Sequence, residues 1–218
     1  MGNDFPVTDR TRMRRKAKRA TYDRAAIYAI VDEALTASVA AVIDGRPQVQ
    51  PMIHVRIGDD IILHGLGGNR LLSALAGGGE ACINVMLLDA LAMARKIEDH
   101  SMLYRSATLY GRGEEVTDED EKAAIMDQVF ASIVRSERLG QLPPLVRGYL
   151  GGTMVVRVPI DEAVGKVNSD VETSDGGDGV WSGYVRVTTG FGPIEPDGRT
   201  EAEGLAAPDD IANYRRTS

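Results

Sequence analysis

The chain has 218 residues, of which 43% are hydrophobic and 26% are charged, the composition of an ordinary globular protein with one core. The formal net charge of -7 provides no excess of cations for nucleic-acid phosphates, so a nucleic-acid partner is not expected. No apolar run approaches the about 20 residues that a membrane span needs, and the N-terminus lacks the basic-then-apolar order of a signal peptide, so no membrane association is expected. A single cysteine, Cys82, cannot form an internal disulfide, which favours a reducing, cytoplasmic location.

The first half of the chain predicts an arm, a helix and an antiparallel sheet. Residues 1–20 are polar and basic and are interpreted as a solvated or subunit-clasping arm. A helix is expected from Thr21, its N-cap, to about Leu35, because apolar residues recur at helical spacing. Residues 37–43, 48–57 and 61–64 are then predicted as three consecutive antiparallel strands, joined by turns rich in Gly and Asp.

The second half continues the sheet and adds helices. The expected elements are a helix at 69–77, strands at 80–88 (extended by 90–96), 100–111 (continued by 112–116), 153–159 and 180–188, and helices at 118–138 and 208–214. Periodicity weakens after Pro159, and residues 170–179 form an acidic loop. Many short strands with few helices predict a small antiparallel β-barrel with helices attached rather than a parallel sheet.

A glycine-rich loop between a strand and a helix is the clearest candidate binding site. Gly65, Gly67 and Gly68 leave the loop without side chains, and Asn69 is a good N-cap for the helix that follows. A helix start offers free backbone N–H groups, and Arg70 adds a cation beside them. These residues predict a phosphate site, with a plain connecting loop as the alternative.

Two further side chains are candidates for chemistry. Arg105 lies in an otherwise apolar strand and needs either a ligand anion or a structural ion pair. His64 enters the glycine loop and is a tentative catalytic acid or base, with a hydrogen-bonded strand-end histidine as the alternative. The histidines lack metal-ligand spacing, so no metal site is expected, and no serine or cysteine has the setting of a nucleophile. A phosphate site without a catalytic side chain points to a bound cofactor.

Several ordered motifs resemble one family. They are Tyr22-Asp23-Arg24, Leu63-His64-Gly65 with Asn69-Arg70, Leu87-Leu88-Asp89, Ala94-Arg95, His100-Ser101-Met102, Tyr104-Arg105-Ser106, Gly165-Lys166-Val167 and Val180-Trp181-Ser182-Gly183. Their order resembles that of the pyridoxamine 5'-phosphate oxidase-like FMN-binding split barrels, in particular the flavin-nucleotide-binding or nitroimidazole-resistance-like branch. This resemblance implies a mainly β (α+β) fold, a six- to seven-stranded antiparallel split β-barrel with flanking helices.

The resemblance also implies a cofactor and its site. FMN is expected in a cleft between the two subunits of a homodimer. Residues 1–20 are the basic arm, residues 21–168 the FMN-binding domain, and residues 169–218 an extension that completes the cofactor site. The residues expected to bind FMN are Met52, Ile53, His64, Gly65, Asn69, Arg70, Ser101, Arg105, Ser106 and Trp181. The chain departs from the pattern of the family at Asn69, Asp99, Leu103 and Asn168.

The function expected from this resemblance is that of an FMN-dependent oxidoreductase. Its substrate is a small organic molecule, with NAD(P)H or dioxygen as the redox partner, and the loops at 97–103 and 170–180 set its specificity. Two alternatives stay open. One is a module that binds flavin, a deazaflavin or haem without turnover, and the other is a flavin-independent enzyme that uses His64, His54 or His100.

Overall fold

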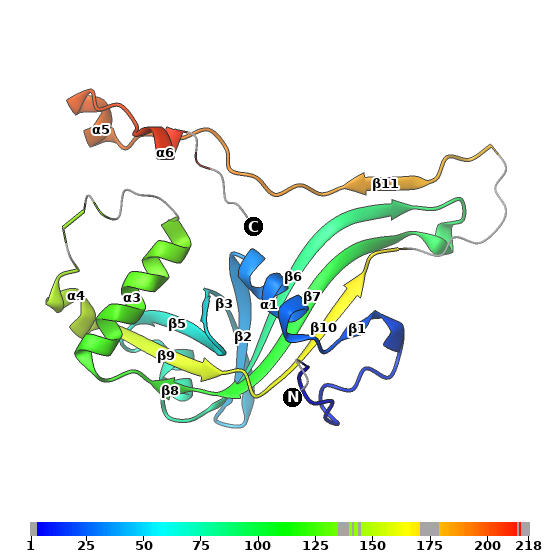
Figure 1. The fold of residues 1–218 in the computed structure, drawn as a ribbon, viewed down its shortest axis with the longest axis horizontal. Coiled ribbons are helices and arrows are strands. Elements are labelled where there is room, and N and C mark those ends of the chain that lie inside the picture. Colours follow the sequence, from blue (N-terminus) through cyan, green and yellow to red (C-terminus); the bar gives the residue numbers. More distant parts are fainter. Residues whose placement is uncertain are drawn as a thin grey trace.

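The protein is built on two antiparallel sheets (Figure 1), seen in a computed structural model that describes residues 4–134, 140, 142–143, 145–170, 179–212 and 214. The seven-stranded sheet has the order β1-β10-β7-β6-β2-β3, with β11 also paired to β6, and the four-stranded sheet has the order β4-β5-β9-β8. The strands are β1 (Ala20–Thr21), β2 (Thr36–Ile43), β3 (Arg46–Ile53), β4 (Val55–Ile57), β5 (Asp60–Leu66), β6 (Glu80–Met93), β7 (Ser101–Arg112), β8 (Glu114–Glu115), β9 (Thr153–Pro159), β10 (Glu162–Asn168) and β11 (Gly183–Arg186).

Six short α-helices and two 3-10 turns surround these sheets in the part of the chain that the structure describes. They are α1 (Arg24–Glu33), α2 (Arg70–Ala76), α3 (Glu119–Val134), α4 (Arg147–Gly152), α5 (Gly198–Glu203), α6 (Asp209–Ala212), η1 (Ala17–Arg19) and η2 (Ile97–Asp99). The mainly β fold with flanking helices is therefore confirmed. The expected number of strands was too low, and the sheets do not close into a complete barrel, because the larger sheet ends at β1 and β3.

The N-terminal segment differs from its prediction. Thr21 is not a helix cap, because it lies in β1 and pairs with Gly165 of β10. The helix begins after Asp23, whose carboxylate accepts a hydrogen bond from the Ala26 N–H at 2.7 Å. The arm is only partly solvated, since Phe5 is buried and its N–H donates to the Tyr22 carbonyl.

Three strand predictions also need correction. Residues 48–57 are not one strand: the chain breaks at His54, and β3 and β4 belong to different sheets. Of residues 112–116, only Arg112 continues β7, because β8 pairs with β9 in the smaller sheet. Strand β10 was not predicted, because its glycine and polar residues interrupt the alternation of apolar and polar side chains. It lies between β1 and β7 in the larger sheet. The other predicted strands and the helix at 69–77 are present, with small shifts of their ends.

The C-terminal half is described with gaps. The predicted helix at 118–138 is α3 as far as Val134, and its last residues lie outside the described part. The predicted acidic loop at 170–179 falls almost entirely outside the described residues. After β11 the chain runs back along the length of the molecule to α5 and α6, which lie above α3 in the view of Figure 1. The Tyr214 hydroxyl donates to the Ile133 carbonyl at the end of α3.

The main core fills the space between the two sheets. Alternate residues of β2, β6 and β7 point into it and meet α1, α2 and β5, and Ile27, Ile61, Leu72 and Ile83 are all buried there. A second, smaller core lies beneath α3. On the opposite face of the larger sheet, no described element covers Val42, Val49 and Met86, which are 70%, 68% and 52% exposed.

Candidate functional site

The predicted phosphate residues lie at the start of α2, but the helix start is less open than expected. The Asn69 side-chain oxygen accepts from the N–H groups of Leu71 and Leu72 at 3.0 and 3.1 Å. Its amide nitrogen lies 3.3 Å from the Gln50 side-chain oxygen on β3. The expectation of free N–H groups is therefore wrong at these two positions, because the cap that shapes the helix also uses them.

Arg70 is the cation available beside this helix start. Its guanidinium pairs with the Asp44 carboxylate at 2.6 Å, and the two side chains are 64% and 79% exposed. An exposed ion pair of this kind contributes little stability, so a ligand phosphate can replace Asp44 at low cost. Arg70 and Asn69 line a hollow of about 290 Å³ whose other wall is β3.

Strand β3 connects this hollow to the predicted ring-binding residues. It forms one end of the larger sheet, so among the described strands the backbone groups on its outer edge have no partner strand. The Met52 side chain points into the core, and Ile53 is 44% exposed. Any contact of Met52 with a cofactor must therefore come from its main chain, as the resemblance implies.

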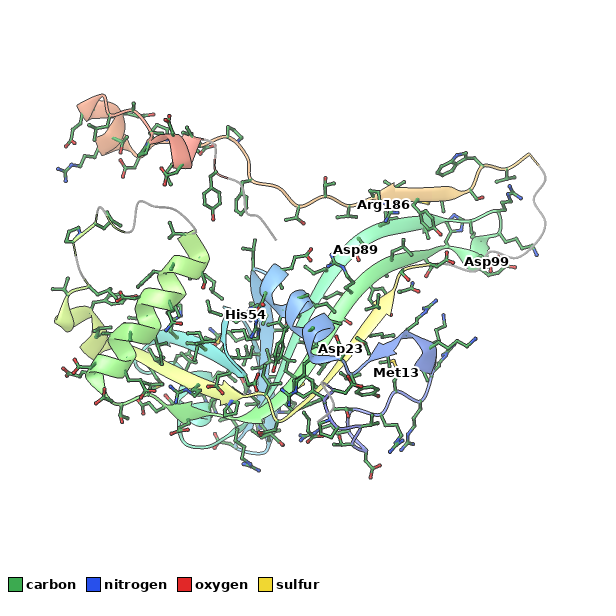
Figure 2. The ribbon with its side chains drawn as sticks, viewed as in Figure 1. Met13, Asp23, His54, Asp89, Asp99 and Arg186 are labelled. Atoms are coloured by element: carbon green, nitrogen blue, oxygen red, sulfur yellow. The ribbon has the colours of Figure 1, made fainter. Side chains whose placement is uncertain are left out.

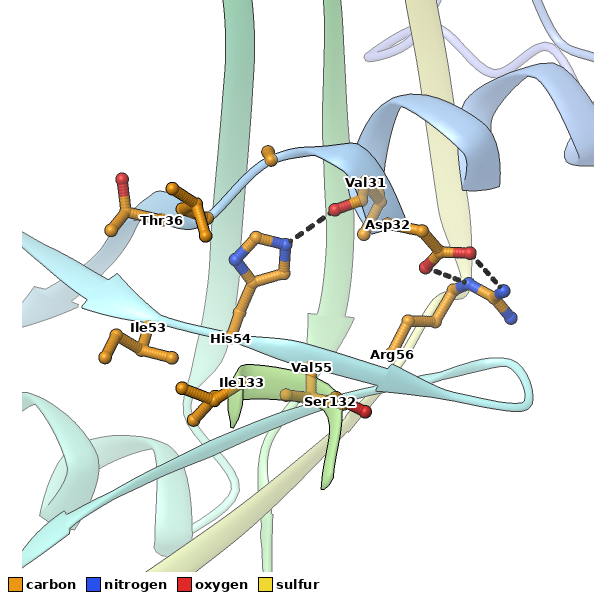
Figure 3. Close-up of a pocket in the computed structure, with 11 residues that line it drawn as sticks. Val31, Asp32, Thr36, Ile53, His54, Val55, Arg56, Ser132 and Ile133 are labelled. Carbon is orange, nitrogen blue, oxygen red and sulfur yellow. Dashed lines mark hydrogen bonds and ion pairs between the residues drawn. The ribbon is translucent and has the colours of Figure 1, made fainter. Parts of the chain in front are cut away.

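A second hollow, of about 370 Å³, lies at the far end of β3. It is lined by the last turn of α1, the residues around His54 and the end of α3 (Figure 3). His54 is 6% exposed, and its Nε2 lies 3.0 Å from the Val31 carbonyl oxygen. Arg56 forms a two-pronged pair with Asp32 at the polar rim. The sequence signal for this site is a histidine between two apolar β-branched residues, Ile53 and Val55.

His64 and Gly65 lie in the other sheet. His64 pairs in register with Val155 of β9, is half-buried, and has its pKa lowered by that burial. A methyl group added to Gly65 would lie 2.9 Å from the Leu72 side chain, so this glycine allows β5 to approach α2 closely. The tentative catalytic role of His64 stays a prediction, because none of the hollows described above includes it.

Arg105 and Ser106 point to opposite faces of the larger sheet. Arg105 faces α1, where its guanidinium binds Glu33 at 2.8 Å and Asp89 at 2.8 Å. These two carboxylates raise its pKa, Glu33 most strongly. Asp89 lies at an irregularity of β6, where the pairing with β7 shifts between Leu88 and Ala90 (Figure 2). Of the two interpretations of Arg105, the structural ion pair is the one observed, and its contact with a cofactor stays a prediction.

Ser101 and Trp181 lie far along the β6–β7 hairpin, away from Arg70. Ser101 pairs with Ala92 and Gly183 pairs with Met93, which places the 67% exposed Trp181 near the same end. Within one chain the predicted residues thus form separate groups along β3, β5 and the hairpin. No three His, Cys, Asp or Glu side chains of the described residues are grouped to hold a metal ion.

Comparisons with known proteins give these groups a context. The sequence profile described as pyridoxamine 5'-phosphate oxidase matches residues 23–167. The chain belongs to this family. No curated protein matches the sequence, and none of the described helices is both long and apolar enough to cross a membrane.

Two solved structures match most of the chain. The flavocytochrome Anf3 from Azotobacter vinelandii is 31% identical, with 94% of this chain and 95% of that chain covered and a TM-score of 0.82. The FAD and haem binding protein from Mycobacterium smegmatis is 29% identical, with 88% and 95% covered and a TM-score of 0.81. A candidate 5-nitroimidazole antibiotic resistance protein from Bacteroides thetaiotaomicron shares the fold at 23% identity, 68% and 86% coverage and a TM-score of 0.59.

Proposed function

We propose that this protein is a flavin-dependent oxidoreductase that acts on a small organic substrate. The observation that carries the proposal is the likeness to a flavocytochrome over 94% of the chain at 31% identity, together with a second likeness to a protein that binds FAD and haem. Both similarities cover more of the chain than the family match at residues 23–167, and they are long enough that each must include part of the C-terminal extension. NAD(P)H or dioxygen is the redox partner that such a site requires.

The flavin lies along β3 in this proposal. Arg70 takes the phosphate in place of Asp44, and Asn69 holds Gln50 and the helix start in position. The exposed edge of β3 presents main-chain groups of Pro51, Met52 and Ile53 to the ring. The ring, when bound, supplies the electron transfer, while the protein supplies position and electrostatics. The phosphate end is common to FMN, which the motifs favour, and to FAD.

A second subunit would bring the separate groups together. The outer face of the larger sheet carries Ser106 together with the exposed apolar residues Val49 and Met86, as the register of β3, β2, β6 and β7 requires. Large exposed apolar patches of this kind mark interaction surfaces. We propose that a homodimer covers this face and that Ser101, Ser106 and Trp181 reach the flavin bound to the partner.

The absorption spectrum of the purified protein tests the proposal first. We expect the bands of an oxidised flavin, and we expect added NADPH to bleach them under anaerobic conditions. A protein that is colourless and takes up neither FMN nor FAD would refute the flavin. A flavin that dithionite reduces but NADPH does not, in a protein that turns over neither dioxygen nor organic acceptors, would indicate a binding module without enzyme activity.

A haem is a second group that one observation favours. His54 is buried beside a mostly apolar hollow, and its Nε2 lies 3.0 Å from the Val31 carbonyl oxygen, a contact that orients the ring. By contrast, His64 lines none of the hollows described here and His100 is exposed. His54 is therefore the residue that would hold an iron porphyrin in this chain.

The haem is tested with protein produced in cells supplied with a haem precursor. We expect a Soret band and the pyridine haemochrome of a b-type haem, both lost in His54→Ala. His100→Ala is the control and keeps both. Protein that binds no added haem, or His54→Ala protein that binds it as well as the wild type, would contradict this assignment.

A further inference from the structure

A hollow at the other end of the molecule from Arg70 shares only Ser101 with the proposed flavin site. It has a volume of about 790 Å³ and lies between residues 16–19, residues 98–101 and residues 167–170. Asp99, on one of its walls, lies at the tip of the long β6–β7 hairpin (Figure 2). Ligand pockets commonly measure about 300–1,000 Å³, so the hollow is large enough for a nucleotide.

One wall of the hollow is cationic. It is formed by Lys16, Lys18 and Arg19, and none of these side chains makes an ion pair with any residue that the structure describes. The backbone that carries them is anchored, because the Arg19 N–H donates to the Lys16 carbonyl at 2.9 Å and Ala20 pairs with Lys166 of β10. An anchored set of cations without acidic partners is suited to bind phosphate groups.

The opposite wall is acidic. Glu98, Asp99 and Asp170 line it, and the Asp170 carboxylate accepts a hydrogen bond from the Tyr184 hydroxyl at 3.0 Å. Carboxylates repel phosphates but accept hydrogen bonds from the hydroxyls of a ribose. The ligand that fits therefore has two ends, an anionic one for the cationic wall and a hydroxyl-bearing or amino-bearing one for the acidic wall.

Asn168, between the two walls, gives an independent sign of a ligand. Its side chain is 2% exposed, and its amide nitrogen donates to the Met102 carbonyl. Its side-chain oxygen is buried and has no hydrogen-bond partner among the described residues. A buried amide oxygen left without a donor is destabilising, and a ligand donor such as an amino group would relieve this once the amide turns toward the hollow.

We propose that this hollow binds the adenosine diphosphate group of a dinucleotide. The diphosphate faces Lys16, Lys18 and Arg19, and the ribose and adenine face the carboxylates and Asn168. FAD and the nicotinamide dinucleotides share this group, and the choice between them is the part of the inference that rests on the proposed function. Binding of the group itself requires no bound flavin and no turnover.

Titration calorimetry with ADP as the probe tests the site on the full-length protein. We expect the triple variant Lys16→Gln, Lys18→Gln, Arg19→Gln to bind ADP at least tenfold more weakly than the wild type. The matched control, Arg12→Gln, Arg14→Gln, Arg15→Gln, removes three cations of the same segment that do not line the hollow, and its affinity should stay within twofold. No binding of ADP by the flavin-free wild type, or an equal loss in both triple variants, would overturn the inference.

Competition separates the two sources of the group. If the site holds the ADP half of FAD, ADP binds to the FAD-free protein and is excluded by FAD. If it holds a nicotinamide dinucleotide, ADP binds in the presence of saturating FAD and is displaced by NADPH. ADP that neither dinucleotide displaces would refute the proposal. A colourless protein that binds ADP with the expected variant effects would refute the flavin but retain the site, so the two failures can be told apart.

Discussion

Arg70 and Arg105 are the two arginines that the motifs assign to the cofactor, and their surroundings differ. Arg105 is held by Glu33 and Asp89 next to α1, and both acids raise its pKa. Releasing this guanidinium to a ligand would leave two carboxylates close together without a cation. Arg70 has one partner, Asp44, at an exposed position. A phosphate can therefore recruit Arg70 at a much lower cost.

Arg70→Gln is expected to weaken flavin binding about tenfold, the effect of losing one charge-assisted hydrogen bond of about 1.4 kcal/mol. The quenching of FMN and FAD fluorescence on addition of the flavin-free protein measures the two dissociation constants. Arg199→Gln, which removes an exposed arginine of α5, is the matched control and should bind flavin as the wild type does. An unchanged affinity in Arg70→Gln would remove this residue from the phosphate site.

His64 makes the stability of the protein depend on pH. Burial lowers its pKa below the ordinary value of 6.5, so the unfolded chain takes up a proton at this residue more readily than the folded one. The contribution of the neutral His64 ring to the free energy of unfolding is complete above pH 6.5 and is lost as the pH falls below that value. The free energy of unfolding should therefore decline on acidification.

Urea unfolding of the wild type and of His64→Gln between pH 7 and pH 5 measures the size of this effect, since these limits bracket the ordinary pKa of 6.5. The decline should be smaller in His64→Gln and unchanged in His100→Gln, which alters an exposed histidine. Parallel curves for all three proteins would show that the ring of His64 is as easily protonated in the folded state as in the unfolded one.

The break between β3 and β4 is the element that shapes the candidate site. Strand β3 of the larger sheet ends at Ile53 and β4 of the smaller sheet begins at Val55, so His54 lies where the chain crosses between the two sheets. The crossing leaves β3 as an end strand and opens the hollow beside α1. If β3 and β4 formed one continuous strand, β3 would not be an end strand and the hollow beside α1 would not form.

Gly111 marks a second crossing, where β7 passes over β9. A methyl group added to this glycine would collide with the backbone carbonyl of Pro159, which a side-chain rotation cannot relieve. We expect Gly111→Ala to lower the free energy of unfolding by about 3 kcal/mol. Gly190→Ala is the control, since its added methyl group meets no atom within 4 Å. Thermal unfolding compares the two, and equal melting temperatures would contradict the close approach.

At the scale of the whole molecule, the outer face of the larger sheet is the surface that exposes the apolar residues Val42, Val49 and Met86. Ser38, Ala40 and Val42 of β2 stand opposite Pro51, Val49 and Pro47 of β3, so they share one face of the sheet. Neighbouring positions on β6 bring Met86 to the same side. Apolar residues this exposed are expected to lie at an interface between subunits.

Val49→Glu is expected to shift the protein from dimer to monomer and to release most of the flavin, because a charge on this face cannot be buried without a partner. Light scattering coupled to size-exclusion chromatography measures the mass, and the absorbance of the same peak measures the flavin. Ile97→Glu changes a residue that is 88% exposed at the hairpin end and should leave both unchanged. A wild-type monomer with bound flavin would refute the shared site.

The sequence by itself determined most of the local structure. Apolar alternation located β2, β5, β6, β7 and β9, and Asn69 marked the start of α2, because these signals depend only on neighbouring residues. Ordered motifs also identified the family, since they record many local requirements at once. The same local signals failed at β10 and at Thr21, where pairing with a distant strand decides the outcome.

Only the tertiary structure decided which candidate residues share a surface. It showed that Asn69 uses the N–H groups of its own helix, that Arg105 faces α1 while Ser106 faces away, and that His54 lies at a hollow between the sheets. It also brought residues 16–19 next to the end of β10. The physical reason is that burial and charge partners arise between segments distant in the chain, which spacing along the sequence does not record.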